Sequence, residues 1–328
     1  LSWFAVKRIR KRLNKEFLTS YKRAVLVTGC DTGFGNALAL KLNENGYRVY
    51  ATVLDTEGEG AKKLVSAQRF EGKTQVLRMD VTKEDEVRDV YEQIQKDLVS
   101  NGEQLWAVVN NAGIITLGPL DWGTVDNYKR VFEVNTFGMV RVSRTFLPLI
   151  RQSKGRIVNL VSMAGRVTIE NLGIYSMTKH AAISFTDGLR RETRKWGIKV
   201  SSIEPMAYKT PMAEREYYFR ELDKQWSEST DDVKQLYGKQ YYEEMRRCGG
   251  QLTADAGDNI YEVIDKMVDA IRSPDPQIRY VSVPGKCRTK LMVKLLQLLP
   301  IEIYDRIAAH KASTNPKPAG LDRLRSEE

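Results

Sequence analysis

The stretch RAVLVTGCDTGFG, residues 23–35, decides the fold. Residues 23–27 are a short β-type run, the glycine-rich turn at 28–35 follows, and residues 37–42 have helical character. Strand, glycine turn and helix therefore come in the order of a phosphate-binding βα unit. Glycines let the backbone approach a pyrophosphate, and the N-terminus of a helix offers unpaired N–H groups and the positive end of its dipole. The alternative interpretation is a tight turn without a ligand.

Further apolar runs place this unit in a larger sheet. Strands are expected at residues 48–53, 75–78, 105–109, 156–161 and 200–204, with helical stretches at 87–99, 128–151 and 175–196 among them. The alternation predicts an α/β fold, a Rossmann-type doubly wound parallel sheet with helices on both faces. The turn NNAG, residues 110–113, closes one strand and is expected to wall the same cleft.

The pentapeptide YSMTK, residues 175–179, carries the candidate chemistry. On a helix, positions i and i+4 share one face, so Lys179 is expected beside Tyr175. A neighbouring ammonium favours phenolate, so we predict that the pKa of Tyr175 lies below its ordinary value of about 10 and that Tyr175 acts as a general acid/base. Ser162 lies thirteen residues upstream, after the strand at 156–161, and should emerge at the carboxyl edge of the sheet. Open α/β sheets bind ligands at that edge.

Five motifs occur together in one order, namely TGxxxGxG, NNAG, an Asn, a Ser and YxxxK. They comprise Thr28, Gly29, Gly33 and Gly35, then Asn110 to Gly113, Asn135, Ser162, and Tyr175 with Lys179. This set resembles the short-chain dehydrogenase/reductase superfamily, and the resemblance extends from Lys22 to Tyr304. The sequence at residues 28–35, 146–151 and 195–200 is similar to that of one branch of this superfamily. That branch contains the 17β- and 11β-hydroxysteroid dehydrogenases of type 2, microsomal retinol dehydrogenases and mitochondrial D-3-hydroxybutyrate dehydrogenase.

The resemblance implies a role for each matching residue. Tyr175 would be the acid/base, Lys179 would lower its pKa and hold a ribose hydroxyl, and Ser162 would polarise the substrate oxygen. Asn135 would anchor a water of the proton relay. The cofactor would be bound by Thr28, Gly29, Asp31, Gly33, Phe34, Gly35, Asp55, Asp80, Val81, Asn111, Ala112, Gly113, Tyr175, Lys179, Pro205 and Thr210.

The loop after the second strand favours NAD over NADP. Asp55 lies in that loop, where a carboxylate bonds a free ribose diol and repels a 2′-phosphate, and no basic residue occurs between Ala51 and Gly60. Asp31 adds negative charge within the glycine turn. The alternative interpretation of Asp55 is an ordinary solvated acid. After the strand at 75–78, Asp80 and Val81 resemble the adenine-contacting pair of the family. In the alternative interpretation, Thr82 with Asp85 caps the next helix.

One position departs from the family pattern. The family reads Pro-Gly after the sixth strand and then a Thr that contacts the carboxamide, whereas this chain reads PMAYKT at residues 205–210. Met206 replaces the Gly and would crowd the nicotinamide or reshape the alcohol pocket, while Thr210 keeps its offset from Pro205. A catalytically weak NAD-binding module at a membrane surface is therefore an alternative.

The domain organisation follows from composition. Residues 1–22 form a basic arm, residues 23–285 the dehydrogenase domain, residues 286–311 an amphipathic segment and residues 312–328 a polar tail. Residues 212–249, rich in Tyr and Trp, are interpreted as a substrate lid. The arm resembles the flank of a membrane anchor, which would place the protein at the endoplasmic reticulum membrane with the catalytic domain toward the cytosol. A mitochondrial presequence and a solvated arm are the alternatives.

Composition limits the other classes of function. Only two histidines and three scattered cysteines occur, so a metal site, a Ser-His-Asp triad and a disulfide framework have no support, and a reducing compartment is expected. The net charge of +10 makes nucleic-acid binding a candidate function. No basic motif is interleaved with aromatic residues, so a nucleic-acid partner is not expected.

Together these features predict an NAD-dependent oxidoreductase for a small lipophilic alcohol or ketone, a steroid or a retinoid. The resemblance also implies a homodimer or tetramer, and a membrane surface is a further expected partner. D-3-hydroxybutyrate oxidation is the alternative activity, because Lys209 or Arg215 near the lid offers a cation for a carboxylate.

Overall fold

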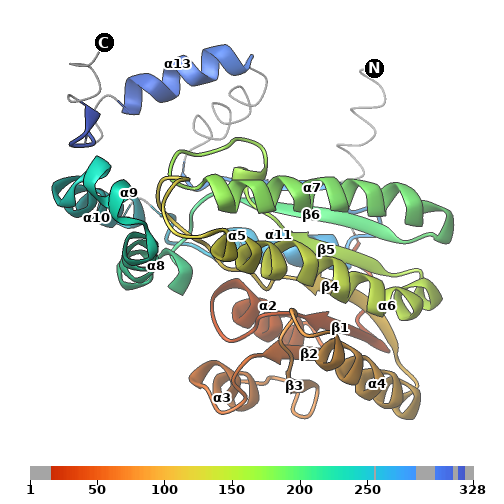
Figure 1. Cartoon of the computed structure of the whole chain (residues 1–328). Coiled ribbons are helices and arrows are strands. Elements are labelled where there is room, and N and C mark those ends of the chain that lie inside the picture. The colour runs from red at the N-terminus through yellow and green to blue at the C-terminus, as the bar shows by residue number, and fades with distance from the viewer. Residues whose placement is uncertain (1–15, 255, 286–299, 313–316, 322–328) are drawn as a thin grey trace.

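In the computed structural model, the described residues are 16–254, 256–285, 300–312 and 317–321. Seven parallel strands form one sheet in the order β3-β2-β1-β4-β5-β6-β7, which confirms the expected parallel α/β fold (Figure 1). The strands are β1 (Arg23–Val27), β2 (Arg48–Val53), β3 (Thr74–Arg78), β4 (Gln104–Asn110), β5 (Arg156–Leu160), β6 (Lys199–Pro205) and β7 (Arg279–Ser282). The strand order reverses between β1 and β4, and open sheets of this kind bind ligands outside such a switch point.

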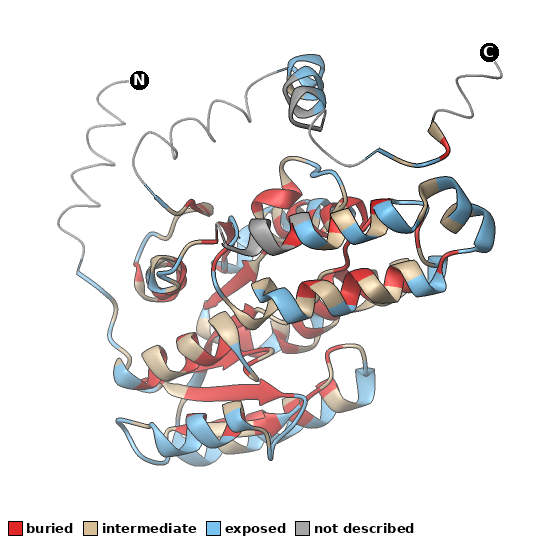
Figure 2. Cartoon of the chain, turned by 90° about the vertical axis from the view of Figure 1, so that its left-hand side faces the viewer, coloured by how far each residue is buried: buried red, intermediate tan, exposed pale blue. Residues whose placement is uncertain are grey.

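Helices cover both faces of the sheet, because successive residues of each buried strand point to opposite sides. Val25 and Val27 join the apolar cluster with α2 (Gly33–Glu44), α3 (Glu59–Ser66) and α11 (Tyr261–Arg272). Ala24 and Leu26 join the other cluster, with α4 (Glu84–Asn101) and α6 (Met139–Ser153), and α7 (Gly173–Thr193) packs on the same face. The strands are accordingly buried almost throughout (Figure 2).

A π-helical segment interrupts the long helix that was expected over residues 128–151. Helix α5 (Val125–Phe132) continues through the π-helical segment η1 (Glu133–Gly138) into α6. Such bulges insert one residue per turn and often occur at functional sites. Here the bulge carries Asn135, which is fully buried.

The expected lid is a group of three helices, α8 (Arg215–Glu228), α9 (Asp231–Tyr237) and α10 (Lys239–Ala254). They lie together beside the sheet, at the end where the strands β4 and β5 finish (Figure 1). Trp122 is their central contact, with ring centroids 4.8 Å from Trp226, 5.5 Å from Tyr237 and 6.0 Å from Tyr241. Much of the aromatic content of this region therefore forms a small hydrophobic core of its own.

The two ends of the chain are described only in part. Helix α13 (Ile301–Ala312) and residues 317–321 are described, whereas most of the basic arm, residues 286–299 and most of the polar tail lie outside the described residues. No helix within the described part of the chain combines the length and apolar character needed to cross a membrane.

We predict that Gly35→Ala lowers the free energy of unfolding by about 1–3 kcal/mol, because extra atoms in a close-packed site force the backbone to shift. A Cβ at Gly35 would lie 2.4 Å from the carbonyl oxygen of Gly29. Gly188→Ala is the matched control, since a Cβ there would meet nothing within 4 Å. Alanine favours a helix over glycine, so this control should gain about 0.5–1 kcal/mol. Urea denaturation of both variants measures the difference, and a Gly35→Ala variant as stable as the wild type would contradict the expected clash.

Candidate active site

The glycine turn between β1 and α2 leaves room for a ligand against its backbone. Gly29 and Gly33 have φ values of 67° and 60°, in the region that disfavours other residues. A Cβ on Gly29 would lie 2.9 Å from Cα of Ala112, so a side chain would not fit there. The turn therefore requires glycine both for its backbone conformation and for its close approach to the loop after β4.

The N-terminus of α2 is free to receive an anion. Thr32, the N-cap residue, makes no side-chain capping bond, and the first turn contains no acidic residue. The first N–H groups of a helix have no partner within the helix, and the helix dipole favours negative charge at that end. The glycine turn and this helix end thus fit a dinucleotide pyrophosphate, as the sequence predicted.

Four hydrogen bonds join the loops that follow β1 and β4. The Thr28 hydroxyl accepts from the backbone N–H groups of Asn111 and Ala112, each at 3.0 Å. The Asn111 side-chain amide donates to the carbonyl oxygens of Thr28 at 2.8 Å and Gly29 at 2.9 Å. Four predicted cofactor-binding residues, Thr28, Gly29, Asn111 and Ala112, therefore hold the two loops together.

Asn135 fastens the next part of that loop to the catalytic helix. Its side chain accepts from the backbone N–H of Ile114 and donates to the Ile114 carbonyl, both at 2.8 Å, and it also donates to the Thr178 hydroxyl at 3.1 Å. Its side-chain amide is therefore engaged with the protein itself, and its anchoring of a relay water stays a prediction. Ile114 and Thr178 were not singled out in the sequence, although Thr178 lies inside the YSMTK pentapeptide.

Tyr175 and Ser162 come together at the carboxyl edge of the sheet. Tyr175 lies in the first turn of α7, and Ser162 caps the short 3-10 helix η2 (Met163–Gly165) after β5. Burial raises the pKa of Tyr175 to about 12, while a hydrogen bond with the Ser162 hydroxyl acts to lower it. The pair is thus arranged for proton exchange with one substrate oxygen.

Lys179 lies beside Tyr175 as predicted. The prediction that it lowers the pKa of Tyr175 below the ordinary value is wrong for the protein without a bound ligand. The amine of Lys179 lies 5.4 Å from the centre of the Tyr175 ring and donates to the Leu160 carbonyl at 3.3 Å. Burial lowers the pKa of Lys179 to about 8, and the net direction of the Tyr175 pKa is upward. Removal of water disfavours the charged form of both groups, which the helical spacing alone does not reveal.

The two acidic residues expected to select the cofactor lie at the carboxyl end of β2. Asp31 accepts from the backbone N–H groups of Leu54 at 2.8 Å and Asp55 at 3.3 Å, so it fastens the glycine turn to that loop. Asp55 is exposed and accepts from the backbone N–H of Glu57 at 2.9 Å. Asp55 therefore presents its carboxylate to solvent. The Asp31 carboxylate instead holds the loop after β2 against the glycine turn.

Asp80 and Val81 lie just after β3, at the carboxyl edge of the sheet. Asp80 accepts from the backbone N–H of Thr82 at 2.9 Å, and its own N–H donates to Glu86 at 2.7 Å. The alternative that Thr82 and Asp85 cap the next helix is wrong, since α4 begins at Glu84 with Lys83 as a cap that has no side-chain bond. Of the two contacts of Asp80, only the one with Glu86 reaches the first turn of α4.

The segment after β6 keeps its expected course despite Met206. The Met206 side chain is 39% exposed, and its backbone is outside the left-handed region, so the position does not require glycine. Thr210 lies over the glycine turn, where a Cβ on Gly33 would come within 3.5 Å of it. Pro205 accepts from the Ser162 hydroxyl at 3.4 Å. Both predicted cofactor-binding positions in this segment therefore lie next to the rest of the site.

A cavity of about 430 Å³ opens between the lid and the turn that precedes α7. Its apolar and aromatic lining includes Leu120, Ile169, Tyr237 and Tyr241, and its wall reaches Gly173, two residues before Tyr175. Polar groups are contributed by Thr168, Glu170 and Asn171. On the lid side, Tyr217 is close enough to Tyr175 to raise its pKa. The sequence had placed Tyr217 in the lid without relating it to the catalytic tyrosine.

Within the described ranges, no group of His, Cys, Asp and Glu side chains is arranged to hold a metal ion. The site instead combines a glycine turn at a switch point, a free helix N-terminus and a Tyr, Ser and Lys group. These features define a dinucleotide-binding oxidoreductase of the open α/β class.

Comparisons with known proteins identify the family. The family model described as short chain dehydrogenase matches residues 23–220, and the chain belongs to this family of oxidoreductases. It is 37% identical over 311 residues to 17-beta-hydroxysteroid dehydrogenase type 2 of Homo sapiens, which covers 94% of this chain and 78% of the relative. It is 36% identical over 294 residues to mitochondrial D-beta-hydroxybutyrate dehydrogenase of Bos taurus, covering 88% and 84%. Retinol dehydrogenase 7 of Rattus norvegicus is 34% identical to this chain over 257 residues, which cover 78% of this chain and 79% of the relative.

Solved structures share the fold. A short chain dehydrogenase/reductase from Burkholderia phymatum in complex with NAD has a TM-score of 0.68 at 22% identity, covering 90% of this chain and 97% of that one. A short chain dehydrogenase from Burkholderia cenocepacia in complex with NADP has a TM-score of 0.61 at 21% identity, covering 90% and 98%. The family as a whole uses NAD or NADP.

We predict that Lys179→Met raises the free energy of unfolding at pH 7. The folded-state pKa of about 8 lies below the ordinary 10.5, so the unfolded chain binds more protons between those values, and wild-type stability rises with pH across that window. The variant lacks the buried amine and should gain up to about 3 kcal/mol at pH 7 and less than about 1 kcal/mol at pH 10. Urea denaturation at the two pH values measures both gains. A variant less stable than the wild type at pH 7 would contradict the unfavourable burial of this amine.

Proposed function

We propose that the chain is an NAD-dependent dehydrogenase that interconverts a secondary or allylic alcohol and its carbonyl, with a lipophilic steroid or retinoid as substrate. The observation that carries this proposal is the meeting of Tyr175, Ser162 and Lys179 beside the glycine turn at the switch point of the sheet. Similarity to hydroxysteroid and retinol dehydrogenases supports the reaction type.

Each side chain of the site has a role in this reaction. Tyr175 takes the hydroxyl proton of the alcohol during oxidation and returns it during reduction. Ser162 holds the substrate oxygen near that phenol through its hydroxyl. Lys179 donates to a ribose hydroxyl, and Asn135 positions the loop that carries Gly113. A bound NAD supplies the acceptor for the hydride and a positively charged ring, which favours the phenolate of Tyr175 over the phenol.

The cofactor preference is the second part of the proposal. The exposed carboxylate of Asp55 and the lack of basic residues between Ala51 and Gly60 support NAD, because a 2′-phosphate would be repelled there. The residues that would hold the dinucleotide are the glycine turn with the N-terminus of α2, the loop at 111–113, Asp80 with Val81, and Pro205 with Thr210.

The lining of the cavity supports a lipophilic substrate over a small hydroxy acid. Ligand sites for apolar compounds are concave and mainly lined by apolar and aromatic side chains. The two cations proposed to bind a carboxylate have other contacts, since Lys209 forms an ion pair with Asp258 and the Arg215 guanidinium lies 4.9 Å from the centre of the Phe219 ring. D-3-hydroxybutyrate oxidation therefore ranks second.

Assembly and location stay predictions. We propose a homodimer or tetramer, as the family resemblance implies, and a location at the endoplasmic reticulum membrane with a mitochondrial alternative. Size-exclusion chromatography with light scattering tests the first, and fractionation of cells that express the full-length protein tests the second.

We predict that Tyr175→Phe lowers kcat for alcohol oxidation by about 10²–10⁴, because the variant loses the group that takes the proton. Reduction of NAD, followed by absorbance, is measured for wild type and variant against hydroxysteroids, retinol and D-3-hydroxybutyrate. Turnover of a lipophilic alcohol by the wild type alone supports the proposal. Turnover of hydroxybutyrate alone favours the second activity, and tight NAD binding without turnover of any alcohol favours the catalytically weak module.

We predict that Asp55→Asn lowers the ratio of kcat/KM with NAD to kcat/KM with NADP by about tenfold, since it removes the charge that repels a 2′-phosphate. The asparagine keeps an oxygen for the Glu57 N–H, so the loop should keep its shape. Glu57→Gln changes net charge equally and serves as the control, with an expected ratio within about twofold of wild type. A ratio unchanged by Asp55→Asn would show that this carboxylate does not select the cofactor.

A further inference from the structure

Glu204 is a buried carboxylate at the carboxyl end of β6, next to the cofactor-binding segment. Its side chain is 1% exposed, and carboxylates are seldom buried so fully unless they are paired. Both carboxylate oxygens accept from Arg166, with Nε at 3.0 Å and Nη2 at 2.9 Å. Ser202 donates to the same carboxylate at 2.6 Å, and Arg279 at 3.3 Å.

Arg166 ends the short turn that begins with Ser162. Within this turn, the Ser162 carbonyl accepts from the N–H of Gly165 at 3.0 Å, and the Ser162 hydroxyl accepts from the N–H of Ala164 at 3.1 Å. The first residue of the turn bonds Pro205 through its hydroxyl, and the last residue bonds Glu204 through its guanidinium. Both ends of the turn are therefore fastened to adjacent residues of one buried strand.

The turn also rests directly on the catalytic helix. A Cβ on Gly165 would lie 2.6 Å from the carbonyl oxygen of Lys179, so backbone meets backbone at that point. A change in the tilt of the turn would consequently alter the position of the Ser162 hydroxyl relative to Tyr175.

We propose that the ion pair between Arg166 and Glu204 is a positioning device that holds the Ser162 hydroxyl at the Tyr175 phenol. Neither residue reaches the reacting atoms, and both act through the turn. This inference deepens the proposed function and rests on it for its kinetic readout alone.

The geometry of the pair suits orientation better than stability. A bidentate contact between a guanidinium and a carboxylate fixes the plane and direction of both groups. Burial of two charges costs solvation energy that their attraction repays only in part, so an apolar pair would hold the elements together as well. An apolar pair would not fix the direction in which the turn points.

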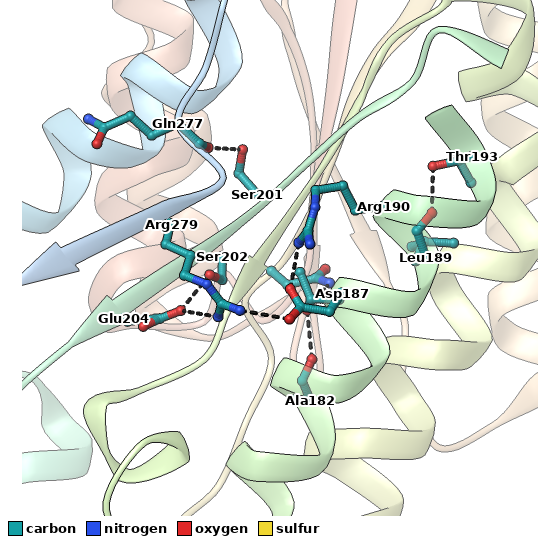
Figure 3. Close-up of polar contacts among 12 residues, drawn as sticks. Ala182, Asp187, Leu189, Arg190, Thr193, Ser201, Ser202, Glu204, Gln277 and Arg279 are labelled. Atoms are coloured by element: carbon teal, nitrogen blue, oxygen red, sulfur yellow. Dashed lines mark hydrogen bonds and ion pairs between the residues drawn. The ribbon is translucent and has the colours of Figure 1, made fainter. Parts of the chain in front are cut away.

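The remaining members of the network supply a control. Arg279 bonds both Glu204 and Asp187 of α7, and it donates to the Asp187 carboxylate at 2.7 Å (Figure 3). Asp187 also accepts from Arg190 at 2.5 Å. Asp187 therefore shares a partner with Glu204, and among the described residues its polar contacts are with Arg190 and Arg279, outside residues 162–166. Asp187→Asn removes the same charge from the same network without touching the turn.

We predict that Glu204→Gln lowers kcat/KM for alcohol oxidation by about tenfold to a hundredfold, since small displacements of a positioned group cost that much. A hydrogen bond with Ser162 acts to lower the pKa of Tyr175, so the rising limb of the pH profile should move to higher pH. KM for NAD should change by less than about twofold, because the cofactor contacts are intact. Asp187→Asn should leave the profile at its wild-type position.

Arg166→Lys separates orientation from charge. Lysine keeps the positive charge and loses the planar fork, so this variant should show the same shift of the pH profile as Glu204→Gln. If only Glu204→Gln shifts the profile, charge and not orientation is responsible, and the proposal is wrong. Arg166→Lys also keeps the test valid if Glu204→Gln fails to fold.

Hydrogen exchange provides a readout without any substrate. The amides of Ala164 and Gly165 donate to Ser162, so they should exchange at least about tenfold faster in Glu204→Gln and Arg166→Lys than in Asp187→Asn. Wild-type exchange in both variants, or equal acceleration in Asp187→Asn, would overturn the proposal. Absence of turnover in the wild type would instead contradict the proposed function and leave this comparison intact.

Discussion

The site depends on a chain of hydrogen bonds that runs from the glycine turn to the catalytic helix. Asn111 joins the loops after β1 and β4 through the backbone of Gly29, and the same loop continues to Ile114, whose backbone is held by Asn135. Asn135 then bonds Thr178, which donates to the Tyr175 carbonyl at 2.7 Å. Every link uses at least one short side chain, and those of Asn135 and Thr178 are fully buried, so few rotamers are available to them. The loops proposed to hold the dinucleotide and the helix that carries the proposed acid/base are therefore joined in one continuous structure.

Electrostatics at this edge oppose stability. The protein buries an amine and a phenol side by side, and the loss of water shifts the pKa of Lys179 down and that of Tyr175 up. Both shifts disfavour the charged forms that the proposed chemistry uses. Functional sites commonly carry such unfavourable terms, which the rest of the fold offsets through its apolar core. The positively charged ring of a bound cofactor would favour the phenolate of Tyr175, as proposed above, but it would further disfavour the ammonium of Lys179.

Local patterns predicted the features that depend on neighbours in sequence. The strand runs, the glycine turn and the Tyr175 and Lys179 spacing all lie within short windows, and each is found where expected. Features set by distant contacts were not predicted. The π-helical segment has no distinct residue pattern, the pairing of Arg166 with Glu204 joins positions 38 apart, and the upward shift of the Tyr175 pKa follows from burial. The aromatic content of residues 212–249 led to their interpretation as a lid, which stays a prediction. The packing of those rings into a separate core depends on Trp122, which lies far upstream and was not singled out.

That separate core gives the lid an optical signature. The indoles of Trp122 and Trp226 lie 4.8 Å apart with their planes inclined at 55°, one contributed by the loop before α5 and the other by α8. Two chromophores at that separation and inclination couple their electronic transitions, and the coupling depends on the packing of α8 against the loop before α5. The aromatic circular dichroism of this protein should therefore contain a contribution that reports this packing, independent of secondary structure and without an added label.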